Sequence, residues 1–289
     1  MKKQLKLGKF SELNLALLLI ATSGPLGRSL TMNPFQSIWW RALLSLFILI
    51  VIIKWSKFNW NLKKIKGRKT LLLSGVLMAI HWVTYFYALQ LSGIAIGMLS
   101  LFTYPVITAF LEPLFTKHKV NLIQVLLAII ICLGMYLILP EFSLENTKTQ
   151  GILWGTLSAL SYSLRNLVLK SSVNNVEAPV IMFYQMLVTA LLLFPSLFFF
   201  PLDEVPSALP ALLSLALFTT CLGHSLFIRS FKNFSVSTVS ILSSIQPVYG
   251  IILGILFLNE TPSITTLIGG VLILSTVVIE GVLSTKKSI

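Results

Sequence analysis

The chain is a succession of apolar stretches, each close to the length with which an α-helix crosses a lipid bilayer. The hydrocarbon core of a bilayer is roughly 30 Å thick, and about 20 helical residues span it. Backbone groups in lipid must be hydrogen-bonded internally, so we predict an all-α integral membrane protein with ten transmembrane helices. The predicted helices cover residues 13–30, 35–54, 70–90, 94–116, 121–139, 151–170, 178–200, 209–228, 234–258 and 263–283.

The composition excludes a soluble protein. Hydrophobic residues make up 56% of the 289 residues and charged residues 11%, whereas soluble domains carry about 25% charged residues. The net charge of +13 does not indicate a nucleic-acid partner, because the basic residues lie in short connections between apolar stretches. Cys132 and Cys221 have no disulfide or metal-site spacing, and we expect no cofactor and no metal.

Basic residues are concentrated in alternate connections. Seven Lys and Arg residues lie between Lys54 and Lys69, whereas the connections on the other side of the membrane hold only Lys148. Because Lys and Arg accumulate in cytoplasmic loops, we predict both termini in the cytoplasm and the protein in the inner or plasma membrane. The first stretch is interpreted as an uncleaved helix, since no good cleavage site follows it.

The sequence contains an internal repeat. Pro105-Val106 lies near the middle of the fourth predicted helix, and Pro247-Val248 lies near the middle of the ninth. Trp39-Trp40-Arg41 likewise corresponds to Phe183-Tyr184-Gln185. These matches divide the chain into two five-helix units, residues 1–140 and 150–289. Because five is odd, the second unit must cross the membrane in the opposite sense, as in the inverted repeats of many secondary transporters.

The second unit carries a further set of motifs. Its mid-helix proline is followed by an apolar run that ends in an acidic residue, then by a Thr-Pro pair and a double glycine, while the first unit contributes an aromatic-Arg pair. These elements are Pro247-Val248, Glu260, Thr261-Pro262, Gly269-Gly270 and Trp40-Arg41. His118 stands where the first unit would have the counterpart of Glu260.

With these motifs, its length and its repeat, the chain resembles the EamA branch of the drug/metabolite transporter superfamily. The resemblance covers nearly the whole sequence. It implies export or exchange of small metabolites, often amino acids or related compounds, without ATP hydrolysis.

Arginines within the predicted helices are candidate ligands for anionic groups. Arg41 is a candidate for bidentate binding of a carboxylate or phosphate; the alternative is a structural clamp or a side chain that reaches the interface. Arg28 and Arg165 are expected at opposite mouths of the protein, where they either steer anions or reach the interface.

The sixth predicted helix carries a polar stripe. Ser158, Ser161, Tyr162 and Arg165 are spaced at i, i+3, i+4 and i+7, on one face of the helix. Such a face must turn toward protein or water, and the sequence leaves open whether it lines a cavity or mediates helix packing.

Aromatic residues and histidines form a second candidate set. His81, Trp82 and Tyr85 are close together on the third helix, and neighbouring helices add Trp40, Tyr104 and Tyr162. These rings either line a site, where they could bind a cation, or only pack. His81 and His224 are candidate proton-coupling groups because histidine titrates near neutral pH, although hydrogen-bonded structural roles are equally compatible with the sequence.

Pro105 and Pro247 are the predicted gating or hinge positions. A mid-helix proline removes a backbone hydrogen bond and bends the helix, and matching interruptions in two halves of a transporter point to its central site. Ser244 and Gln246, next to Pro247, are therefore predicted substrate ligands. Glu260 is interpreted as part of a turn, with Thr261 capping the last helix and Pro262 at its first position.

The sequence thus predicts a secondary transporter that moves a small zwitterionic or anionic metabolite. The alternative is an exporter of lipophilic or quaternary cations, but no acidic residue stands near the middle of a predicted helix to couple such export to protons. A membrane enzyme or a channel is less favoured, because no catalytic constellation or charged ring is present. Expected partners are the substrate and membrane lipid, and the protein is expected to be a monomer or homodimer.

Overall fold

A computed structural model of the protein describes residues 2–115, 122–138, 143–169, 176–234, 239 and 242–286. His118 and several predicted helix ends lie outside these residues. Every element within the described residues is helical. Five of these segments are long and apolar enough to cross a membrane, namely Lys9–Arg28, Pro34–Trp55, Arg68–Leu101, Ala178–Phe199 and Val205–Ser230.

The helices of the first half follow the predicted ranges with two differences. The first predicted helix is divided between α1 (Lys2–Ala21) and α2 (Ser23–Arg28), and α3 covers Pro34–Trp55. The third and fourth are joined in α4 (Arg68–Leu101), after which α5 (Tyr104–Leu111) and α6 (Leu122–Ile138) follow. Gly93, with φ of 80° and ψ of 175°, interrupts α4 in a conformation that glycine adopts readily.

The second half begins with α7 (Thr147–Leu169), α8 (Ala178–Leu193) and α9 (Ser196–Phe199). The eighth predicted helix is continuous but changes type, from α10 (Val205–Ser214) through a π-helical segment, η3 (Leu215–His224), to α11 (Ser225–Ser230). The π-helix is wider than the α-helix and is rare, and many of the known examples lie at functional sites. The last two helices are α13 (Ile245–Leu258) and α14 (Ile264–Lys286).

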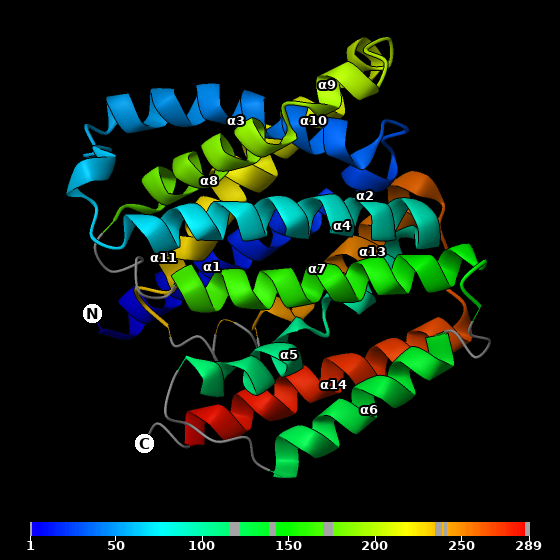
Figure 1. The fold of residues 1–289 in the computed structure, drawn as a ribbon. Helices are drawn as coiled ribbons and strands as arrows, with labels where there is room; N and C mark the ends of the chain where they lie inside the picture. The colour runs from blue at the N-terminus through cyan, green and yellow to red at the C-terminus, as the bar shows by residue number, and fades with distance from the viewer. Residues whose placement is uncertain are drawn as a thin grey trace.

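The helices run roughly side by side along one axis (Figure 1). α3 packs on α8, α4 packs on both α7 and α8, and α6 packs on α14. α1 begins and α14 ends at the same end of the bundle (Figure 1). We call the opposite end, where Arg28 and the α13–α14 connection lie, the outer end.

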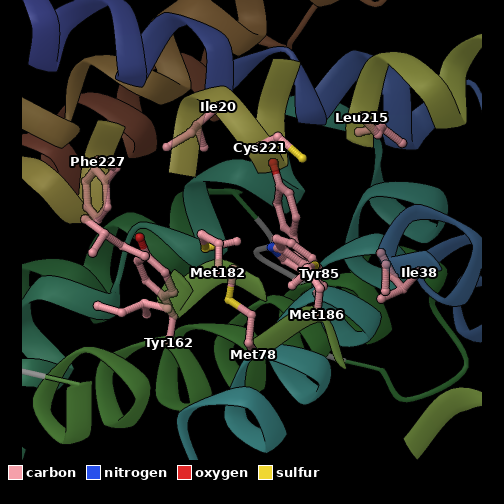
Figure 2. Close-up of a cluster of buried hydrophobic side chains, with 14 of the residues drawn as sticks. Ile20, Ile38, Met78, Tyr85, Tyr162, Met182, Met186, Leu215, Cys221 and Phe227 are labelled. Carbon is pink, nitrogen blue, oxygen red and sulfur yellow. The ribbon is translucent and has the colours of Figure 1, made fainter. Parts of the chain in front are cut away.

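The core joins both halves of the chain. Methionines of α4 and α8 fill its centre, and Met78, Met182 and Met186 are completely buried. Figure 2 shows these side chains with Tyr85 and Tyr162 between the helices. Flexible thioethers fill irregular gaps between helices, so the two halves pack as one body.

Candidate functional site

A small cavity lies in the middle of the bundle, between the two halves. Its volume is about 30 Å³, which is room for roughly two water molecules. Cavities that hold drug-sized ligands measure about 300–1,000 Å³, so this cavity is too small to hold such a ligand in the conformation seen. The lining residues are Ile20, Ser23, His81, Trp82, Tyr85, Met98, Leu101, Phe102, Tyr104, Tyr162, His224 and Gln246.

Seven of the candidate residues line this cavity: His81, Trp82, Tyr85, Tyr104, Tyr162, His224 and Gln246. They come from α4, α5, α7, η3 and α13. Their rings contact one another, with Tyr104 and Tyr162 at a centroid distance of 5.0 Å and Trp82 and His224 at 5.5 Å. The wall is therefore largely aromatic, with polar groups at a few positions.

Arg41 contacts the wall of the cavity and is not part of the lining. Its guanidinium carbon lies 3.7 Å from the centroid of the Trp82 ring. Nε donates to Thr220 Oγ1 and Nη2 donates to Thr219 Oγ1, each at 2.8 Å. The residue is completely buried, and Nη1 has no hydrogen-bond partner.

Arg165 likewise lies near an aromatic residue of the cavity wall, Tyr162, without lining the cavity itself. Its guanidinium carbon lies 5.9 Å from the Tyr162 ring, Nη2 donates to Gln185 Oε1 at 2.7 Å, and Nη1 donates to Asn166 Oδ1 at 2.9 Å. Gln185 in turn donates to Ser74 Oγ at 2.8 Å. Arg165 is completely buried, and its Nε has no partner. The expectation that Arg165 lies at a mouth of the protein is wrong.

The centre of the protein therefore carries uncompensated positive charge. Arg41 and Arg165 are both completely buried, and no carboxylate is buried among the described residues. Buried charges are normally paired, because transfer of an ion out of water is costly. Each guanidinium instead donates to neutral acceptors and has one nitrogen without a partner.

Hydrogen bonds to Ser158 fix the ring of His81. The Ser158 hydroxyl donates to the His81 carbonyl oxygen at 2.8 Å, and Nδ1 of the same histidine lies 2.7 Å from Ser158 Oγ. Because a hydroxyl has only one proton to donate, a hydrogen on Nδ1 is required wherever the Ser158 hydroxyl donates to the carbonyl. His224 differs, since its buried Nδ1 has no partner.

The remaining predicted residues lie close to the cavity without lining it. Within the α7 stripe Tyr162 lines the cavity, whereas Ser158, Ser161 and Arg165 are buried outside the lining, and Ser161 donates to the Leu157 carbonyl of its own helix at 2.9 Å. Pro105 and Pro247 each lie in the first turn of a helix, α5 or α13, directly after a short interruption of the helical chain at Phe102–Thr103 or at Ser244. Proline fits there because the first amides of a helix have no intrahelical partner. Ser244 directly precedes α13.

The outer end contains an ion pair that joins the two halves. Arg28 Nε lies 2.5 Å from Glu260 Oε1, and the Ile94 amide donates to Glu260 Oε2 at 2.9 Å. Beside them is an outer pocket of about 440 Å³. The predicted cap at Thr261 is wrong: α14 begins at Ile264, and Ser263 Oγ accepts from the Thr266 amide.

Three residues around the arginines were not predicted from the sequence, namely Thr219, Thr220 and Gln185. Thr219 and Thr220 look like ordinary polar residues of an apolar helix, and no sequence signal marks them as acceptors for Arg41. Gln185 had a signal, since the repeat aligns it with Arg41. Among the described residues, no group of three His, Cys, Asp or Glu side chains could hold a metal ion.

Comparison with known proteins shows the relationship directly. The sequence profile of the EamA-like transporter family matches residues 13–139 and again residues 149–280. An uncharacterised transporter of Archaeoglobus fulgidus is 30% identical over 73% of this chain and 76% of its own. The pseudopaline exporter CntI of Pseudomonas aeruginosa is 25% identical over 72% of this chain and 73% of its own. A solved crystal structure shares the fold, with a TM-score of 0.69 at 17% identity over 96% of this chain and 98% of that one.

Proposed function

Because the chain belongs to the EamA-like transporter family, we propose that it is a secondary transporter of a small zwitterionic or anionic metabolite, such as an amino acid. Transport proceeds by alternating access to the central cavity. The observation that carries the substrate class is the pair of buried, uncompensated guanidiniums against the aromatic wall. The relative named as a pseudopaline exporter supports export of a metabolite.

We propose two inverted five-helix units, residues 1–140 and 150–289, within a bundle of ten transmembrane helices. The twofold match of the family profile supports this division. The hydrogen bonds of Arg41 and Gln185 support it too. Arg41, on the second helix of the first unit, donates to the third helix of the second unit, and Gln185, on the second helix of the second unit, donates to Ser74 on the third helix of the first unit. A twofold axis in the membrane plane would relate these two connections.

The buried charges favour an anionic group over a cation in the cavity. At an effective dielectric constant of about 20, a unit charge at roughly 8–10 Å contributes about 2 kcal/mol. Two guanidiniums therefore stabilise a carboxylate in the cavity and repel an ammonium group. Since the Trp82 ring already contacts the Arg41 guanidinium, a second cation on that ring would be close to the first.

Export of lipophilic cations is the second candidate, and the aromatic wall is the observation that favours it. Tyr85, Tyr104 and Tyr162 present rings without a guanidinium as close as that on Trp82. Ring faces attract quaternary ammonium groups, so an aromatic cage for a bulky cation fits the lining but not its charge.

Orientation and assembly complete the proposal. The positive-inside distribution and the common end at which α1 begins and α14 ends (Figure 1) support cytoplasmic termini in an inner or plasma membrane. The functional unit is a monomer or homodimer, because each chain contains both halves of the cavity.

A ligand-stabilisation screen of the purified protein tests this function. A ligand that binds only the folded state at 100 times its Kd stabilises it by about 2.7 kcal/mol. We expect a raised melting temperature with amino acids or carboxylates and then flux of the same compound into proteoliposomes. Stabilisation confined to quaternary ammonium compounds would replace the proposal with cation export.

A further inference from the structure

We infer that the helical turn from Ile94 to Met98 is the outer gate of the transporter and that Glu260 is the residue that holds this gate shut. The inference rests on the proposed function, because a gate requires a transport path. Of these residues only Met98 lines the central cavity. Ile94 and Glu260 line the outer pocket.

One turn of α4 separates the central cavity from the outer pocket. Met98 lines the cavity, and Ile94, one turn nearer the outer end, lines the outer pocket. Side chains at i and i+4 lie on the same helix face, and both are buried, with exposures of 1% and 2%. Ala95 and Ile96 also line the outer pocket, so the pocket and the cavity come within one helical turn of each other at this part of α4.

Glycines of the opposing helices receive these two side chains. A Cβ at Gly254 would lie 2.6 Å from Ile94 Cδ1, a Cβ at Gly24 would lie 3.0 Å from Met98 Sδ, and a Cβ at Gly250 would overlap Met98. Gly250 and Gly254 belong to α13 and Gly24 to α2. The first and second halves of the chain are thus in direct contact between the cavity and the outer pocket, and this contact closes the path.

Glu260, in the second half of the chain, binds the gate turn and Arg28 of the first half. Gly93 interrupts α4 immediately before the gate, which leaves the Ile94 amide free to donate to Glu260 Oε2. The other carboxylate oxygen accepts from Arg28, whose Nη1 donates to the Gln90 carbonyl at 2.7 Å. Charge-assisted hydrogen bonds of this kind are stronger than neutral ones. The Arg28 and Glu260 side chains remain 35% and 29% exposed, so water from the outer pocket can replace them when the gate opens.

Labelling of a cysteine inside the cavity tests the gate without any substrate. The background carries Cys132→Ser and Cys221→Ala, and Ser23→Cys places one thiol in the cavity wall. An impermeant thiol reagent is added outside right-side-out vesicles. Glu260→Gln keeps the shape of the side chain but loses its charge, and we expect it to raise the labelling rate about tenfold.

Glu204→Gln is the matched control, since Glu204 is also at the outer end and accepts from Thr31 but does not line the outer pocket. Equal labelling rates in the Glu260 and Glu204 variants would overturn the gate, whether or not the protein transports anything. Faster labelling only in the Glu260 variant supports the gate even if no carboxylate or amino acid is bound, and in that case only the proposed substrate class fails.

A disulfide provides the opposite test. A Cβ at Gly254 lies 3.6 Å from Ile94 Cβ, within the 3.5–4.5 Å range of disulfides. Oxidised Ile94→Cys/Gly254→Cys protein should lose flux of any substrate found, and reduction should restore it. Unchanged flux in fully cross-linked protein would overturn the inference.

Discussion

The guanidinium carbon of Arg41 lies 3.7 Å from the centre of the Trp82 ring, and Trp82 lines the cavity whereas Arg41 does not. The charge of Arg41 therefore acts on the cavity through an aromatic side chain. In the same way Tyr162 lies between the cavity and Arg165. Under the proposed function, this arrangement attracts an anion to a largely aromatic wall without a direct ion pair that would hold it too tightly for release.

Replacement of Arg41 by methionine tests the role of its charge. Arg41→Met keeps much of the side-chain volume, so the fold should survive, while removal of one charge near the cavity should weaken binding of an anionic ligand by about 2 kcal/mol, or roughly thirtyfold. Titration calorimetry of the ligand from the screen measures this. Arg229→Met is the control, since Arg229 pairs with Glu12 and is exposed. Equal affinity in both variants would contradict the electrostatic role.

A carboxylate at position 185 should neutralise the second guanidinium. Gln185→Glu places a negative charge at the acceptor that already receives Arg165 Nη2, so the protein should fold and bind anions at least about tenfold more weakly. Gln185→Leu should instead destabilise the fold by about 1–3 kcal/mol, because a buried donor loses its acceptor. Melting temperature and affinity, measured on both variants, separate the two effects, and an unchanged affinity in Gln185→Glu would count against the anion site.

Two serines of α7 make a matched pair for stability. Ser158→Ala removes the acceptor of His81 Nδ1 and the donor to its carbonyl, and should lower the free energy of unfolding by about 1–3 kcal/mol. Ser161→Ala removes a hydroxyl that bonds only to its own helix, and its effect should be less than about 1 kcal/mol. Thermal melting in detergent compares them. Similar losses in both variants would show that the His81–Ser158 contact is unimportant.

Accessibility of the connections tests the orientation. In the background without native cysteines, Lys57→Cys should react with an impermeant reagent only from the cytoplasmic side, and Leu202→Cys only from the outside. Both positions are exposed in connections at opposite ends of the bundle. The reverse pattern would invert the proposed topology and place Glu260 at the inner side.

Much of the architecture follows from the sequence alone. Apolar stretches of bilayer length predict the helices because hydrocarbon leaves the backbone little other way to satisfy its hydrogen bonds. Every element among the described residues is helical, and five segments are long and apolar enough to cross a membrane. The candidate aromatic residues were identified for the same reason, since a polar or aromatic face in an apolar helix must turn toward protein. Seven of the candidate residues line one cavity.

What the tertiary structure decided is which side chains meet across the bundle. The acceptors of Arg41 lie 178 and 179 residues away along the chain, and Glu260 lies 166 residues from the Ile94 amide that it accepts from. Hydrophobic periodicity determines the buried face of each helix but not its register against its neighbours. That register follows from close contacts such as those at Gly250 and Gly254, and it places the arginines behind the wall and the gate between the two hollows.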